Sequence, residues 1–170
     1  LSGNQLEELP KEIGSLASLE SLSLNINKFK EFPECLTRLK NLKFLGLGMN
    51  LISNIPASIA NLKNLKILAL NINLISRLPE TFRNLKSLEF LSLDNNRLES
   101  LPESIDQLTS LKKLKLRSNK LVSLPESLFK LHNLKKLDIS DNDIYQIPNI
   151  KSKLNYFDVF EYDEKKINLK

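Results

Sequence analysis

The sequence predicts a curved α/β solenoid, with parallel β-strands on the concave side and short helical or 3-10 segments on the convex side. Leucine, proline and asparagine all recur at one interval of 23 residues. The leucines are Leu19, Leu42, Leu65, Leu88, Leu111 and Leu134, with Phe157 at the next step. The prolines are Pro10, Pro33, Pro56, Pro79, Pro102, Pro125 and Pro148, and the asparagines are Asn4, Asn27, Asn50, Asn73, Asn96, Asn119 and Asn142. Self-similarity at a fixed period is typical of repeat architectures.

Each repeat begins with a predicted β-strand, and the unit reads L-x-x-L-x-L-x-x-N-x-L-x-x-L-P-x-x-I-x-x-L-x-x. In one copy, Leu91 and Leu93 supply the apolar residues of the strand. They alternate with Phe90, Ser92 and Asp94, which we expect to be exposed. A single strand of this kind cannot bury its apolar face, so stacked repeats are expected to form one parallel sheet over a shared core.

An asparagine follows each predicted strand, where the chain turns away from the sheet. The side-chain amide of Asn96 can both donate and accept hydrogen bonds, so it can satisfy backbone groups of its own coil and of a neighbouring coil. Repetition of this residue predicts a buried asparagine ladder along the solenoid.

The second half of each repeat is predicted to be helical. Leu101, Ile105 and Leu108 follow at helical spacing, and Pro102 can occupy the first turn without loss of a needed donor. Neighbouring strands lie about 4.8 Å apart, whereas packed helices need roughly twice that distance. The sheet is therefore expected to lie on the inner side of a curve.

The 170 residues suit a single domain. We expect a partial repeat (1–18), full repeats (19–41, 42–64, 65–87, 88–110 and 111–133), a degenerate repeat (134–156) and a C-terminal capping strand (157–170). Asn4 is already a ladder residue, so we expect further residues to precede Leu1. In the degenerate repeat, Lys151 occupies the isoleucine position, where Ile150 can substitute. Lys165 replaces the last ladder asparagine.

The repeat motif resembles the leucine-rich-repeat family, in its 23-residue L-P-x-x-I-x-x-L subtype, over nearly the whole chain. The resemblance implies a leucine-rich-repeat horseshoe and a non-enzymatic protein–protein interaction module. Two groups share the subtype: intracellular Ras-regulating and polarity scaffolds, and repeat proteins of bacterial pathogens, notably leptospires. Lysine and asparagine are frequent at the variable positions of the repeat, which favours the bacterial group. This group implies a secreted or cell-surface protein that recognises host proteins. The intracellular scaffold is the alternative, and the compartment stays open.

Catalytic and cofactor chemistry is not expected. His132 is the only histidine, and Cys35, the only cysteine, has no histidine in its repeat to act as its base. No cofactor or metal ion is expected. No apolar run reaches the roughly 20 residues that a membrane helix needs, so membrane insertion is not expected either. Lysine and arginine exceed aspartate and glutamate by only 25 to 20, and the basic cluster lacks interleaved aromatic residues, which argues against nucleic acid. We expect a monomer.

The variable positions of the strands should form the binding surface. The third position gives Phe44, Ile67 and Phe90 in succession, beside a floor of small residues (Ser23, Gly46, Ala69 and Ser92). The eighth position gives Ile26, Met49 and Ile72, which either tuck into the turn or stand exposed. A contiguous exposed apolar patch would mark a contact surface.

A basic zone follows the apolar one, and an acidic zone follows that. The basic residues are Lys112, Lys113, Lys115, Arg117, Lys135 and Lys136, and the acidic ones are Asp138, Asp141, Asp143, Asp158, Glu161 and Asp163. Such charges are either an ordinary solvated face or a means of orienting a protein partner. The predicted concave partner site comprises Phe44, Ile67, Phe90, Ile26, Met49, Ile72, Asn71, Asp94, Lys113, Lys115, Arg117 and Asp138.

Overall fold

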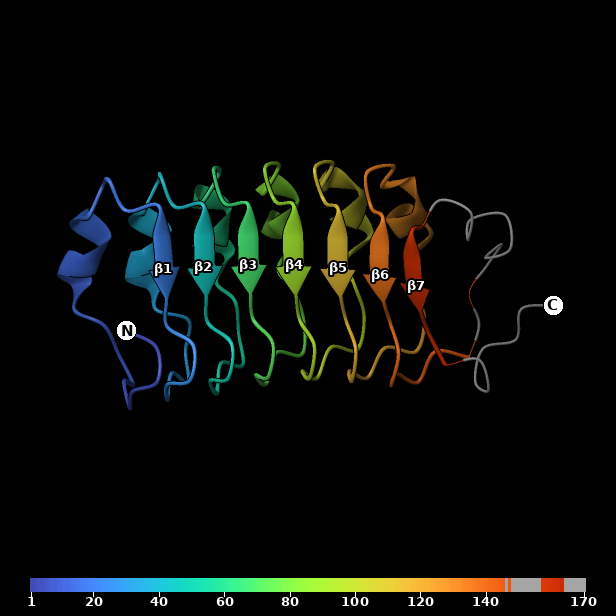
Figure 1. The fold of residues 1–170 in the computed structure, drawn as a ribbon, viewed down its shortest axis with the longest axis horizontal. Coiled ribbons are helices and arrows are strands. Elements are labelled where there is room, and N and C mark those ends of the chain that lie inside the picture. The colour runs from blue at the N-terminus through green and yellow to red at the C-terminus, as the bar shows by residue number, and fades with distance from the viewer. Residues whose placement is uncertain (146, 148–156, 164–170) are drawn as a thin grey trace.

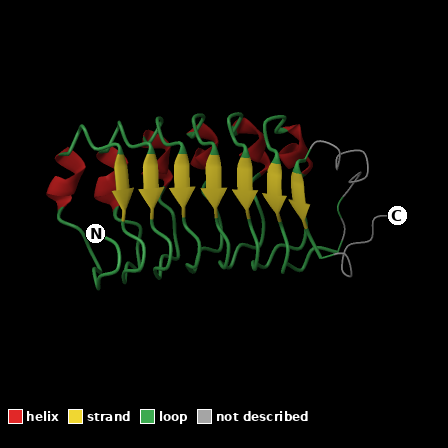
Figure 2. Cartoon of the chain, viewed as in Figure 1, coloured by secondary structure: helices red, strands yellow, loops and turns green. Residues whose placement is uncertain are grey.

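The computed structural model describes residues 1–145, 147 and 157–163. Seven strands of three residues form one parallel sheet in chain order (Figures 1 and 2). They are β1 (Ser21–Ser23), β2 (Phe44–Gly46), β3 (Ile67–Ala69), β4 (Phe90–Ser92), β5 (Lys113–Lys115), β6 (Lys136–Asp138) and β7 (Val159–Glu161). Each residue pairs with the one 23 positions later, as Leu45 does with Leu68. The predicted solenoid, with its concave parallel sheet, is confirmed.

Short 3-10 helices lie behind the sheet in Figure 1 and form the convex side. They are η1 (Lys11–Ser15), η2 (Glu34–Arg38), η3 (Ala57–Asn61), η4 (Glu80–Asn84), η5 (Glu103–Gln107) and η6 (Glu126–Lys130). Each begins directly after a repeat proline; Pro102, for example, has φ −66° before η5. Each helix closes with a bond such as Leu108 N–H to the Ile105 carbonyl, at 3.1 Å. The period of the prolines therefore sets the period of the helices.

The repeat leucines fill the space between the sheet and the helices. Leu91 and Leu93 of the strand segment are fully buried, and Ile105 and Leu108 of the helical segment are at most 1% exposed. Burial of one such side chain stabilises the fold by about 1.5–3 kcal/mol. The strand period and the helix period in the sequence thus define two walls of one continuous core.

Six buried asparagines form the predicted ladder: Asn27, Asn50, Asn73, Asn96, Asn119 and Asn142. In one step, Asn73 Oδ1 accepts from the Ile52 backbone N–H at 2.9 Å. Its Nδ2 donates to the carbonyls of Leu70 and Leu47, each at 3.0 Å. One side chain therefore ties its own coil to the preceding coil. Asn4, in the same register, is exposed, and its Nδ2 donates to the nearby carbonyls of Leu1 and Ser2.

Aromatic residues replace leucines beside β7. The rings of Phe157 and Phe160 stack with centroids 5.3 Å apart, and Phe160 stacks on Tyr162 at 5.0 Å. All three pack against the core, at the positions that leucines occupy in the other repeats. The substitutions at Lys151 and Lys165 lie outside the described residues.

Candidate functional site

The concave face receives two side chains from each strand, because the middle residue points into the core. Leu45, Leu68 and Leu91 are fully buried at the middle positions of β2, β3 and β4. The residues before them in each strand are only partly buried. This alternation follows from the period of two along a β-strand.

Phe44, Ile67 and Phe90 form what we call the apolar strip. They are register neighbours on β2, β3 and β4, and each is half-buried. Adjacent strands lie about 4.8 Å apart, so the three side chains make one continuous apolar surface. The structure thus brings these predicted site residues together.

Small residues run along the sheet beside the apolar strip. Ser92, which we expected to be exposed, is only 5% exposed, and Gly46 is buried as well. The expectation for Ser92 was wrong because its short side chain lies beside the much longer Lys115, its register neighbour about 4.8 Å away on β5, and is shielded from water. Its Oγ also lies 3.4 Å from Asp94 Oδ2.

Ile26, Met49 and Ile72 form a second apolar row, which we call the apolar rim. They occupy the turn that follows β1, β2 and β3, with exposed fractions of 51%, 45% and 43%. Of the two alternatives that the sequence left open, the structure shows the exposed one.

The residues of the apolar rim also adopt an uncommon backbone conformation. Ile26, Met49 and Ile72 have φ of 57°, 56° and 55°, in the left-handed region. The corresponding residues of the later repeats, Asn95 and Asp141 among them, have φ of 55° and 54°. Asparagine and aspartate tolerate this region, whereas a β-branched isoleucine there is an outlier. Sequence reasoning missed this constraint, although Asn95 and Asp141 were a signal of it.

Asn71 and Asp94 lie at the seventh position of their repeats, and each side chain lies close to the backbone of a neighbouring coil. A Cβ atom on Gly48 would lie 2.6 Å from Asn71 Oδ1, so glycine permits the close approach of this side chain. Asp94 Oδ1 accepts from the Arg117 backbone N–H at 3.0 Å, and Asp94 Oδ2 lies 3.8 Å from Lys115 Nζ. Burial raises the pKa of Asp94, and the Lys115 ammonium opposes that rise.

The predicted basic residues have different partners in the structure. Lys113 Nζ lies 5.5 Å from the ring centroid of Phe90, which is the geometry of a cation–π contact. Arg117 Nε bonds Asp141 Oδ2 at 2.7 Å, and this carboxylate raises the pKa of the guanidinium. Asp138 Oδ1 accepts from the Ser140 backbone N–H at 3.1 Å. The apolar and basic zones are therefore in direct contact through Lys113 and Phe90.

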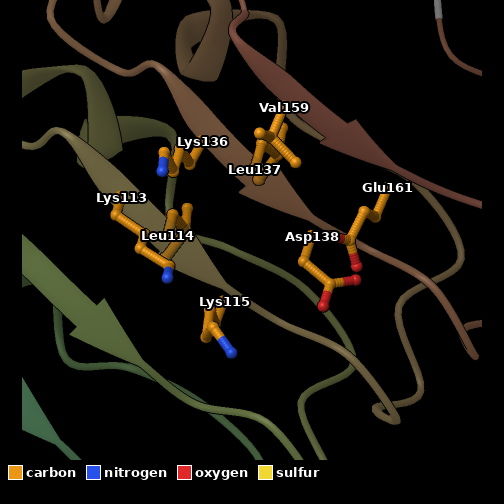
Figure 3. Close-up of a pocket in the computed structure, with 8 residues that line it drawn as sticks. All are labelled: Lys113, Leu114, Lys115, Lys136, Leu137, Asp138, Val159 and Glu161. Atoms are coloured by element: carbon orange, nitrogen blue, oxygen red, sulfur yellow. The ribbon is translucent and has the colours of Figure 1, made fainter.

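A depression of about 220 Å³ lies over β5, β6 and β7, and Figure 3 shows its lining. The ammonium groups of Lys113, Lys115 and Lys136 lie on the left of this view, and the carboxylates of Asp138 and Glu161 lie on the right. Basic and acidic groups thus occupy opposite sides of one hollow.

The structure adds little to the chemistry of Cys35 and His132. Cys35 is half-buried against the core, and burial raises the pKa of its thiol. His132 is exposed after η6. Within the described residues, no group of three histidine, cysteine, aspartate or glutamate residues could hold a metal ion. In the same part of the chain, no helix has the length and apolar character needed to cross a bilayer.

Comparison with known proteins supports the repeat architecture. The model of a leucine-rich repeat region matches residues 34–146. A leucine-rich-repeat protein of Leptospira interrogans is 37% identical, with a TM-score of 0.90 over 96% of this chain. An internalin, InlF, of Listeria monocytogenes is 27% identical, with a TM-score of 0.81 over 95% of this chain. This chain spans 42% and 46% of those two chains.

A plant protein is also similar. The ectodomain of the Arabidopsis thaliana receptor kinase GASSHO1/SCHENGEN3, solved in complex with CASPARIAN STRIP INTEGRITY FACTOR 2, is 31% identical. Its TM-score is 0.72 over 92% of this chain and 23% of its own. A search of curated proteins gives no match. With the repeat model covering most of its length, the chain belongs to the leucine-rich-repeat family.

Proposed function

We propose that this chain is a non-enzymatic module that binds a protein partner on its concave face. The observation that carries the proposal is the exposure of the apolar rim in the turns after β1, β2 and β3, together with the apolar strip on β2, β3 and β4, with the small residues of the strands between the two rows. Contiguous apolar surface of this kind is typical of protein contact sites. Interface energy concentrates in a few apolar, often aromatic, residues inside a polar border, and Phe44 and Phe90 have that setting.

The backbone at the apolar rim supports the proposal. Isoleucine at positive φ is disfavoured by about 1–2 kcal/mol, and Ile26 and Ile72 recover little of this through burial, since they are 51% and 43% exposed. Asparagine at the same position of a later repeat, Asn95, meets the demands of the turn better. Folding alone does not account for the two isoleucines, whereas a bound partner would.

The ligand class follows from the remaining charges. Carboxylates lie close to the lysines of the concave face: Lys115 Nζ is 3.8 Å from Asp94 Oδ2, and Asp138 is the register neighbour of Lys115 on β6. A phosphate backbone would meet repulsion there, so we propose a protein rather than a nucleic acid. The plant receptor ectodomain, a similar solenoid, was solved in complex with a partner, which supports a binding role.

The setting that we propose is bacterial. Two of the similar structures come from Leptospira interrogans and Listeria monocytogenes. We propose a secreted or surface-displayed protein that recognises host proteins. Protease treatment of intact cells should then degrade the full-length gene product, whereas protection of the whole pool until lysis would contradict surface display or secretion.

The binding site is tested with a double variant, Phe44→Ser with Phe90→Ser. Surface plasmon resonance against a panel of purified mammalian cell-surface and matrix proteins should identify a partner of the wild-type protein. The variant should bind it at least about tenfold more weakly, because two central apolar contacts are lost.

The matched control is Val122→Ser, which removes an apolar side chain that is 50% exposed and lies outside the sheet. It should bind as the wild type does. Circular dichroism melts should show that all variants fold. Equal affinity of the double variant and the wild type for the partner would refute the concave site.

A further inference from the structure

The depression over β5, β6 and β7 is a second recognition feature of the concave face, distinct from the apolar strip and the apolar rim. Its polar lining is formed by Lys113, Lys115, Lys136, Asp138 and Glu161 (Figure 3). Lys115 Nζ lies 3.8 Å from Asp94 Oδ2, outside the depression, which leaves Lys113 and Lys136 as the lysines of this lining without a carboxylate partner among the described residues. Its volume of about 220 Å³ is below the roughly 300–1,000 Å³ of most small-molecule pockets. A hollow of this size suits one or two side chains of a larger ligand.

Two lysines lie side by side at one end of the depression. Lys113 and Lys136 are register neighbours on β5 and β6, so their Cα atoms are about 4.8 Å apart. Among the described residues, neither ammonium has a carboxylate within ion-pair distance. Like charges at neighbouring strand positions repel, and a bound carboxylate would relieve that repulsion.

The position of Lys113 is constrained by the apolar strip. Its ammonium lies 5.5 Å from the centroid of the Phe90 ring, and the N–H donors on the side away from the ring can still bond an anion. Restriction of a long side chain before binding lowers the entropy lost when the ligand arrives.

Two carboxylates lie side by side at the other end. Asp138 and Glu161 are register neighbours on β6 and β7. The nearby Arg117 guanidinium is bonded to Asp141 at 2.7 Å. Its charge is therefore balanced mainly by Asp141 rather than by Asp138 or Glu161. The midpoint of this acidic pair is one strand and two residues away from the midpoint of the lysine pair, or roughly 8 Å.

We propose that the depression receives an extended segment of the protein partner that carries an acidic and a basic side chain on the same side. The acidic side chain lies between Lys113 and Lys136, and the basic one lies against Asp138 and Glu161. Residues i and i+2 of an extended chain point the same way about 7 Å apart, which matches the separation of the two pairs. The inference rests on the proposed function, since it names the chemistry of the partner next to the apolar contact.

The test is selection from a displayed library of short random peptides on the immobilised wild-type protein. Enriched peptides should carry an acidic and a basic residue two positions apart. Resynthesised peptides should lose about tenfold or more in affinity when the acidic residue is changed to its amide. They should lose as much on the variant Lys113→Glu with Lys136→Glu, and these losses should shrink as salt rises.

The matched control is Lys40→Glu with Lys63→Glu, two exposed lysines that follow η2 and η3. Both double variants change the formal net charge from +5 to +1, since each Lys→Glu change removes two units. The control should retain peptide affinity. Lys113→Gln with Lys136→Gln repeats the test without new carboxylates, and thermal melts show which variants fold.

Each other outcome overturns the inference. Peptides that lose affinity on Phe44→Ser with Phe90→Ser, but not on the lysine changes, would leave the proposed function standing without this subsite. Peptides indifferent to both sets of changes would overturn both. Failure to enrich any charged pattern, or a dimer in light scattering that the lysine reversal dissociates, would likewise exclude a partner segment at this position.

Discussion

The two halves of the concave face share one backbone and differ in what their variable positions carry. Over β2–β4 the third position is apolar (Phe44, Ile67, Phe90), whereas over β5 and β6 it is lysine (Lys113, Lys136). The eighth position changes too: isoleucine and methionine at positive φ give way to asparagine, serine and aspartate. Both halves keep the same leucines and ladder asparagines. Every repeat of the two halves thus keeps the leucines and asparagines on which the stacking of coils depends. The residues at the third and eighth positions differ between the halves.

The first prediction tests whether the two halves share a scaffold. Asn73→Ala in the apolar half and Asn119→Ala in the charged half should each lower the free energy of unfolding by about 1–3 kcal/mol. Each change leaves a buried backbone N–H without its acceptor: that of Ile52 for Asn73 and that of Leu98 for Asn119. Chemical denaturation measures the difference.

Asn54→Ala is the control, because Asn54 is exposed and bonds only the neighbouring Ser53 hydroxyl at 3.2 Å. It should change stability little. If only one of Asn73→Ala and Asn119→Ala lowered the free energy of unfolding, the two halves would not share a scaffold.

The second prediction concerns the eighth position, where the halves differ in backbone preference. Ile72→Asn should raise the free energy of unfolding by about 1 kcal/mol, because asparagine tolerates the φ of 55°. Asn95→Ile should lower it by a similar amount. The same Ile72→Asn change should weaken partner binding, since it removes an exposed apolar contact.

Val122→Asn is the control for loss of an exposed apolar side chain, as Val122 is 50% exposed and is not among the residues with positive φ. The Val122→Asn variant should have nearly the same free energy of unfolding as the wild type. A loss of stability in Ile72→Asn would show that the isoleucine serves the fold rather than a partner.

The third prediction, with the smallest effect, concerns Asp94 at the junction of the halves. Burial raises its pKa above the ordinary value of 3.8. As the pH rises from 3.8 to the higher pKa of the folded protein, Asp94 loses its proton in the unfolded chain before it does in the folded one. The free energy of unfolding therefore falls over this pH range. Asp94→Asn should therefore be slightly more stable than wild type at neutral pH, and this advantage should fade below pH 3.8.

Denaturation of both proteins across that pH range measures the difference. A growing advantage for Asp94→Asn as the pH falls would mean that Lys115 and the Arg117 N–H outweigh burial, and that the pKa of Asp94 is lowered instead.

The sequence by itself determined the period, the strand positions, the convex helices and the ladder. These features repeat because each coil must present the same groups to its neighbours, as Asn73 does to Leu47 and Ile52 of the preceding coil. The direction of the third-position side chains also follows from strand geometry alone, so Phe44, Ile67 and Phe90 could be placed on the concave face in advance.

Only the tertiary structure decided what those exposed groups contact. The shielding of Ser92, the cation–π contact of Lys113 with Phe90 and the engagement of Asp94 by the Arg117 N–H all arise between coils. So does the left-handed turn that leaves Ile26, Met49 and Ile72 exposed, since hydrogen bonds such as Ile26 N–H to the Gly48 carbonyl, at 2.9 Å, hold it against the next coil. Their partners lie one repeat away, about 4.8 Å across the sheet, and the distances and angles there are set by the stacking of coils rather than by residue type.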